Sequence, residues 1–162
     1  MPIHYMMPAV SGKMVVVVED DEAMRSYLNE VLTSGGYGCR SFPNSAAALE
    51  WLSSGKERVD LVLSDVNMPG MNGLDLLRTV KTVAPDLPFI LISGRRDFHI
   101  VRNAVLAGAA GYLLKPVPPA DLLSLISEHV NTVDSGKLEA AKEALKRYSK
   151  QAKLSRFSAS PK

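Results

Sequence analysis

Five short candidate strands, four of them apolar runs and each followed by a stretch with helical spacing, constrain the fold of this chain most strongly. The first run, Met14–Val18, is a row of apolar residues rich in valine with no polar alternation, which is typical of a strand buried on both faces. We predict the other strands at residues 37–41, 60–64, 88–92 and 112–114. Each predicted strand is followed by a stretch with helical periodicity, and these stretches lie at residues 24–32, 44–52, 74–83, 100–105 and 122–130.

Strands that alternate with helices of this length predict an α/β fold. We expect a doubly wound, five-stranded parallel sheet of (βα)5 type, with a C-terminal helical extension. We divide the chain into a flexible leader (1–12), a folded domain (13–133) and a basic helical tail or linker (134–162). Folds of this type bind ligands beyond the carboxyl ends of the strands, so the residues there are the candidates for function.

Cysteine usage and hydropathy indicate a cytoplasmic protein. Cys39 is the single cysteine, which excludes an internal disulfide, and we expect it to be a small buried residue or a strand residue rather than a reactive thiol. No stretch approaches the roughly 20 apolar residues that a membrane helix needs, and the N-terminal residues do not resemble a signal peptide. We therefore predict no association with membranes.

Charged and hydroxyl side chains follow four of the predicted strands. Glu19 and Asp20 come after the first strand, Asp65 after the third, Ser93 after the fourth and Lys115 after the fifth. Clustered carboxylates repel one another unless a cation lies between them, and hard oxygen ligands favour Mg²⁺. A lysine and a hydroxyl can bind phosphate oxygens, and a central carboxylate can act as a nucleophile. The pattern predicts phosphoryl transfer that depends on Mg²⁺.

These motifs resemble the CheY-like receiver domains of two-component response regulators. The resemblance extends from Lys13 to Val130, with every motif in the order that the family has. It implies a flavodoxin-like fold and a signalling switch rather than an enzyme in the usual sense, with autophosphorylation that depends on Mg²⁺ and slow autodephosphorylation. The segments that carry it are VVVVEDDEAMR (15–25), LVLSDVNMPGMNGLDLL (61–77), FILISG (89–94) and GAAGYLLKP (108–116).

The resemblance assigns a role to each residue of the predicted site. Asp65 matches the phosphoacceptor, and it also contributes to the metal site. Asp20 matches a direct Mg²⁺ ligand, and Glu19 matches the acidic position that acts through a metal-bound water. Asn67 matches the residue whose backbone carbonyl binds the metal. Lys115 matches the lysine that pairs with the phosphoryl group.

The resemblance also implies a conformational switch. Ser93 stands where the family has a threonine or serine, and Tyr112 stands at the aromatic switch position, although ordinary packing is an equal alternative for this tyrosine. The bond between Lys115 and Pro116 is expected to be cis. Asp21 receives no ligand role.

The resemblance further implies the partners of the chain. A sensor histidine kinase or a phosphotransfer protein would supply the phosphoryl group. The face of the fourth helix, fifth strand and fifth helix would then control a downstream protein or an output domain, or form a homodimer that depends on phosphorylation.

Two other functions compete with the switch. A phosphatase of the haloacid-dehalogenase type also uses a nucleophilic aspartate after a strand, but it has a second aspartate two residues later, where this chain has Asn67. A receiver-like adaptor would bind partners without phosphorylation, but such adaptors usually lack part of the acidic pocket. We favour the switch.

The C-terminal tail differs from the rest of the chain in charge. Residues 1–136 hold 11 Lys and Arg against 15 Asp and Glu, whereas residues 137–162 hold 8 against 2. We predict a charged helix over 137–153 and disorder over 155–162. A solvated helix, a docking helix, a linker and a dimer contact all remain open, whereas binding to nucleic acid is not expected because no helix-turn-helix is present. Apolar residues at coiled-coil spacing are Leu138, Ala141, Leu145, Tyr148 and Ala152.

Overall fold

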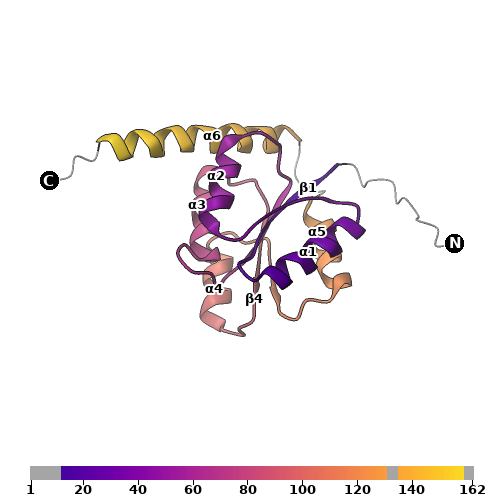
Figure 1. The fold of residues 1–162 in the computed structure, drawn as a ribbon. Helices are drawn as coiled ribbons and strands as arrows, with labels where there is room; N and C mark the ends of the chain where they lie inside the picture. The colour runs from indigo at the N-terminus through magenta and orange to yellow at the C-terminus, as the bar shows by residue number, and fades with distance from the viewer. Residues whose placement is uncertain (1–11, 131–134, 159–162) are drawn as a thin grey trace.

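The computed structural model describes residues 12–130 and 135–158 (Figure 1). Most of the predicted leader, residues 1–11, and the predicted disorder of residues 159–162 therefore lie outside the described residues. The strands are β1 (Met14–Val18), β2 (Gly38–Phe42), β3 (Leu61–Asp65), β4 (Phe89–Ser93) and β5 (Gly111–Leu114). The helices are α1 (Glu22–Ser34), α2 (Ser45–Ser54), α3 (Gly73–Val83), α4 (Phe98–Leu106), α5 (Pro119–Val130) and α6 (Ser135–Ser158).

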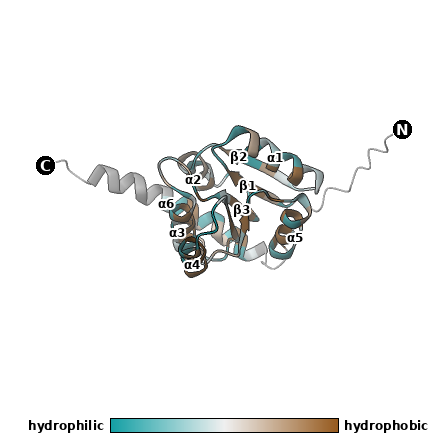
Figure 2. Ribbon diagram, turned by 90° about the horizontal axis from the view of Figure 1, so that it is seen from below, coloured by the Kyte–Doolittle hydropathy of each residue, from teal (hydrophilic) through white to brown (hydrophobic). Residues whose placement is uncertain are grey.

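The five strands form one parallel sheet in the order β2-β1-β3-β4-β5. Helices α1 and α5 cover one face of the sheet, and α2, α3 and α4 cover the other (Figures 1 and 2). The predicted α/β fold class, with its C-terminal helix, is confirmed. All strands end at the same edge of the sheet, so the side chains that follow them meet there.

The central strands have apolar side chains on both faces because helices cover both. In β1, Val15 and Val17 pack with α1 and α5, whereas Val16 and Val18 pack with the helices of the opposite face. Every residue of β3 and β4 is buried. This burial explains why the strand sequences are continuous apolar runs rather than alternating ones.

Helix caps set where the chain turns from each strand into the next helix. Asn44 caps α2, and its side chain accepts a hydrogen bond from the backbone N–H of Ala47 at 2.8 Å. The same helix ends at Gly55, which has the left-handed φ of 61° that favours a residue without Cβ. Asp21, which received no ligand role, caps α1 by accepting from the N–H of Ala23.

Cys39 lies on the edge strand β2 and is partly buried. Its thiol donates a hydrogen bond to Oδ1 of Asn29 at 2.9 Å. Burial raises the pKa of the Cys39 thiol to about 11. Because the thiolate is the nucleophilic form, this cysteine is largely unreactive at neutral pH, as expected from the sequence.

Helix α6 packs against α2 and α3 (Figure 1). Leu138, Ala141 and Leu145 are buried in the same cluster as the side chains beneath α2 and α3, and Tyr148 is partly buried. The side chain of Ala152, the last residue of the predicted seam, lies outside the described residues. The apolar seam therefore contacts the body of the protein. No helix in the described ranges is long and apolar enough to cross a membrane.

The chain continues as a helix through residues 155–158, where we predicted disorder. The sequence contains no glycine or proline between Lys137 and Ser160 to end a helix. Our boundary between the folded domain and the tail, at residue 134, stays a prediction.

Candidate functional site

The turn after β1 carries two acidic side chains with different exposure. Glu19 is fully buried, whereas Asp20 is exposed at the rim of the sheet. The backbone N–H of Glu19 donates to the carbonyl of Phe42 at 3.0 Å, and the N–H of Asp21 donates to Oε1 of Glu19 at 3.2 Å. The turn therefore holds the Glu19 carboxylate in the protein interior and leaves the Asp20 carboxylate exposed to solvent.

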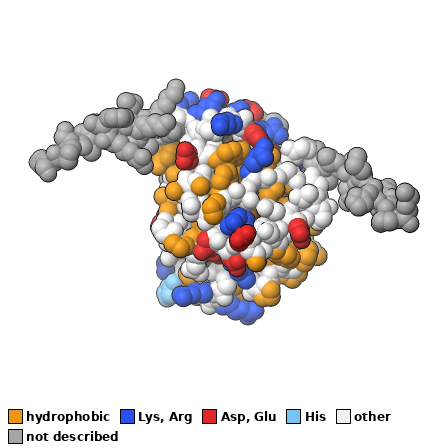
Figure 3. Space-filling view, viewed as in Figure 1, with side chains coloured by type: hydrophobic (Ala, Val, Ile, Leu, Met, Phe, Trp, Pro, Cys, Tyr) orange, Lys and Arg blue, Asp and Glu red, His pale blue; other side chains and the backbone are white. Residues whose placement is uncertain are grey.

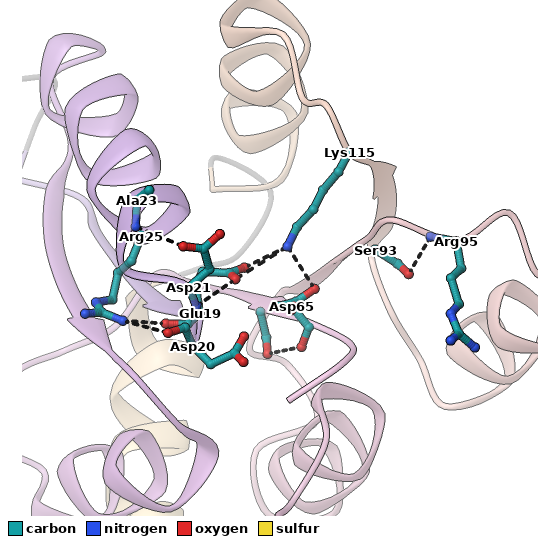
Figure 4. Close-up of polar contacts among 10 residues, drawn as sticks. Glu19, Asp20, Asp21, Ala23, Arg25, Asp65, Ser93, Arg95 and Lys115 are labelled. Carbon is teal, nitrogen blue, oxygen red and sulfur yellow. Dashed lines mark hydrogen bonds and ion pairs between the residues drawn. The ribbon is translucent and has the colours of Figure 1, made fainter. Parts of the chain in front are cut away.

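Asp65 is the last residue of β3 and lies in the centre of the site (Figure 4). Its side chain is almost completely buried. The Nζ atom of Lys115 lies 3.4 Å from Oδ1 of Asp65 and 3.2 Å from Oε2 of Glu19, so one ammonium group pairs with two carboxylates. The fold thus brings together three residues that we predicted from the strand ends.

The carboxylates of Glu19, Asp20 and Asp65 form a cluster that fits a metal ion. One oxygen from each lies within 4.8 Å of the others. Three hard oxygen ligands, two buried and one exposed, match Mg²⁺, which keeps several waters and shares phosphate oxygens. Figure 3 shows acidic side chains gathered next to a basic one on this side of the molecule. The donor set therefore fits the metal that we expected from the sequence.

The pKa values of the buried carboxyls reflect this crowding. Burial, together with the charge of Asp65, raises the pKa of Glu19, and Lys115 offsets part of this effect. Burial also raises the pKa of Asp65, again against the effect of Lys115. Burial alone would lower the pKa of Lys115, but the two carboxylates outweigh it and raise this pKa. A cation at the cluster would lower the cost of keeping these carboxyls ionised.

Ser93 and Tyr112 are linked through the backbone of Arg95. The buried Ser93 hydroxyl accepts a hydrogen bond from the N–H of Arg95 at 3.1 Å, and the Tyr112 hydroxyl donates to the carbonyl of the same residue, also at 3.1 Å. The loop between β4 and α4 therefore joins the two predicted switch residues. The expected cis bond between Lys115 and Pro116 is present, and Asn67 is exposed in the loop after β3.

Comparison with known families identifies the family to which this fold belongs. The family model for the response regulator receiver domain matches residues 15–127. This chain is a response regulator receiver domain. Receiver domains are phosphoacceptor signalling modules of two-component systems, and the observed acidic cluster resembles a magnesium site. The match disfavours the haloacid-dehalogenase alternative.

Several relatives share this receiver domain. The chain is 37% identical over 117 residues to the DNA-binding transcriptional regulator NtrC of Rhizobium meliloti, covering 72% of this chain and 24% of NtrC. It is 38% identical over 137 residues to the response regulator protein FleR of Pseudomonas aeruginosa, covering 85% of this chain and 28% of FleR. The chain thus spans about a quarter of the length of these relatives.

The solved structures agree with the family match. A CheY-like response regulator receiver domain protein from Methanospirillum hungatei superposes with a TM-score of 0.70 at 29% identity, covering 75% of this chain and 95% of that one. A receiver domain protein from Clostridium thermocellum gives 0.70 at 27% identity, covering 74% and 94%. The family model ends at residue 127, before α6 begins.

Sequence reasoning missed two features of the receiver site. The first is Arg25, whose side chain reaches back to the acidic turn. Its position one helical turn after Asp21 was the only available signal. The second is the close packing of Gly73 against the backbone of Asp65, which residue type and spacing alone do not reveal.

We expect Gly73→Ala to damage the site. A Cβ built on Gly73 would overlap the carbonyl oxygen of Asp65, which is backbone and cannot turn aside. The variant should lose about 1–3 kcal/mol of unfolding free energy and displace Asp65. Gly94→Ala is the matched control, because no atom lies within 4 Å of a Cβ there. Equal unfolding midpoints in urea for the two variants would contradict this account.

Proposed function

We propose that Asp65 of this receiver accepts a phosphoryl group from a phosphohistidine of a sensor histidine kinase or phosphotransfer protein. The supporting observation is the convergence of Glu19, Asp20, Asp65 and Lys115 at the carboxyl edge of the sheet. Family membership supports the same reaction, because a receiver domain implies a histidine kinase partner.

The proposed reaction is an in-line transfer between two nucleophiles. A carboxylate oxygen of Asp65 bonds to phosphorus while the bond between phosphorus and the histidine nitrogen breaks. The imidazole keeps the electron pair of that bond and takes up a proton from water. Glu19, Asp20 and Asp65, with the backbone carbonyl of Asn67, would hold Mg²⁺, which offsets negative charge on the phosphoryl oxygens.

Lys115 would stabilise the phosphoryl oxygens through the positive charge of its ammonium group. Its Nζ atom lies within 3.4 Å of both Glu19 and Asp65, so its charge is already directed at the reacting carboxylate. An ordered charge of this kind stabilises negative charge as it develops and needs little rearrangement.

The Ser93 hydroxyl supports a route from the site to the surface. If it turns to donate to a phosphoryl oxygen, the N–H of Arg95 loses its acceptor, and the loop that also holds the Tyr112 hydroxyl is released. Phosphorylation would in this way shift the balance between two states of the surface formed by α4, β5 and α5.

This surface has the properties of a docking site. Phe98, Val105 and Leu106 of α4 are 75%, 65% and 71% exposed, which is unusual for three large apolar side chains on one helix. Phe98 also lines a groove of about 630 Å³, together with Tyr112 and Pro116 among others. We infer that a downstream protein, an output domain or a second phosphorylated copy binds here, in the cytoplasm.

Acetyl phosphate with Mg²⁺ tests the phosphoacceptor proposal. The intact mass of the wild-type protein should increase by one phosphoryl group, and the gain should disappear in Asp65→Asn and on removal of Mg²⁺ with a chelator. The asparagine keeps the size of the side chain but lacks the nucleophilic charge. A wild-type protein that neither gains mass nor binds Mg²⁺ would favour the adaptor alternative.

A further inference from the structure

We propose that Arg25 is a positioning residue that holds the acidic turn of Glu19 and Asp20 in the geometry that binds Mg²⁺. This inference rests on the magnesium site of the proposed function. Arg25 lies in the first turns of α1, and its side chain folds back toward the end of β1 (Figure 4). Nη1 donates a hydrogen bond to the carbonyl of Glu19 at 2.8 Å and approaches the carbonyl of Asp20 at 3.5 Å.

The carbonyl of Glu19 needs a partner that the sheet does not provide. The pairings of β1 end at Val18, opposite Phe42 on one side and Ser64 on the other. The N–H of Glu19 still reaches the carbonyl of Phe42, but its own carbonyl has passed the end of the ladder. Arg25 supplies this missing donor, and it does so at a partly buried position, where an unpaired carbonyl would be costly.

The guanidinium of Arg25 makes no ion pair within 4.0 Å in the described part of the chain. The ion pairs in that part of the chain are made by other cationic side chains, and the cation that pairs with Glu19 and Asp65 is Lys115. The two cations approach the acidic residues from different sides (Figure 4). Lys115 contacts the carboxylates, whereas Arg25 contacts the backbone that carries them. The contacts therefore indicate a role in orienting the ligands rather than in neutralising them.

The two roles predict opposite effects on Mg²⁺ affinity. If Arg25 acted only through its charge, its removal would take away a cation next to the metal and tighten Mg²⁺ binding. If it orients the turn, its removal lets Glu19 and Asp20 move and weakens binding. Groups that orient metal ligands typically contribute about 10- to 100-fold to affinity. The sign of the change therefore separates positioning from charge.

Calorimetric titration of the full chain with MgCl₂ measures this sign directly. We expect Arg25→Ala to bind Mg²⁺ about 10-fold more weakly than wild type. Arg25→Lys, which keeps one donor and the charge, should recover part of the affinity. Arg78→Ala is the matched control, because Arg78 is a half-exposed helical arginine that pairs with Asp75 on the surface of α3. It should bind Mg²⁺ as the wild type does.

Thermal unfolding of each variant without Mg²⁺ shows whether the fold is intact, and Arg25→Lys provides the readout if Arg25→Ala does not fold. Unchanged or tighter binding by Arg25→Ala, or an equal loss in Arg78→Ala, would overturn the inference. A wild type that binds no Mg²⁺ would overturn it together with the magnesium site. A wild type that binds Mg²⁺ but takes no phosphoryl group would overturn the phosphoacceptor proposal alone.

Discussion

Replacement of Lys115 by alanine is expected to slow phosphorylation by acetyl phosphate by about 100-fold or more, even at saturating Mg²⁺. Lys115 is the cation that contacts both Asp65 and Glu19, and the proposed reaction adds further negative charge at Asp65. Mg²⁺ binding should not weaken, because the variant loses a cation that competes for the same carboxylates. The rate of mass gain in time-resolved intact-mass spectra measures the first effect, and calorimetry measures the second.

Lys56→Ala is the control for this prediction, since Lys56 is an exposed lysine whose removal should leave the rate unchanged. Lys115→Arg keeps the positive charge but replaces a compact ammonium with a planar group, so it should recover only part of the rate. A rate for Lys115→Ala within threefold of wild type would show that the ammonium group is not part of the reaction.

The Lys115→Ala variant should also be less stable than the wild type, by an amount that depends on pH. Without Lys115, Glu19 loses the partner that offsets its burial, so its pKa should rise further above the ordinary value of 4.5. A carboxyl whose pKa is raised by folding stabilises the protein below its unfolded pKa and loses this contribution as pH rises through the folded pKa. The deficit in unfolding free energy should therefore be larger at neutral pH than below about pH 4, and Mg²⁺ should reduce it.

The second large effect concerns α6. We expect Leu138→Ala and Leu145→Ala each to lower the free energy of unfolding by about 2–5 kcal/mol, as truncations of buried leucines do. Both side chains are almost fully buried in the cluster shared with α2 and α3, and Leu145 lines a small cavity with Leu52 and Leu87. Urea unfolding monitored by circular dichroism measures the loss.

Glu143→Ala provides the matched control on the opposite side of α6. Glu143 is exposed and pairs with Lys146 across one helical turn, and such a surface pair contributes little to stability. If the leucine variants unfold at the same urea concentration as this control, α6 does not contribute to the folded core in solution, and the solvated-helix alternative for the tail would be favoured.

The strand ends show how much of the site was predictable. Glu19, Asp65 and Lys115 could be placed at one edge because apolar runs define parallel strands, and parallel strands end together. The residue types then indicated the chemistry. Arg25 could not be found in this way, because its contact is with a backbone carbonyl, and any arginine on an exposed helix looks similar in sequence.

The tail shows a second limit of prediction from sequence, because a pattern can be found without its packing partner. The spacing of Leu138, Ala141 and Leu145 predicted an apolar seam along a helix, but periodicity only identifies which side chains lie on the same side of that helix. Whether the seam faces solvent, another copy or the body depends on the surface that α2 and α3 present. That surface is made by residues far away in the sequence.

The alternation of strands and helices, the order of the functional groups and the chemistry that they imply can all be predicted from the amino-acid sequence. These features depend on residue type and short-range spacing. Three features became visible in the folded chain alone: the bridging of two carboxylates by Lys115, the link from Ser93 to Tyr112 through Arg95, and the packing of α6 on α2 and α3. Hydrogen bonds, ion pairs and close packing act over a few ångströms, so they depend on which distant segments the fold brings together.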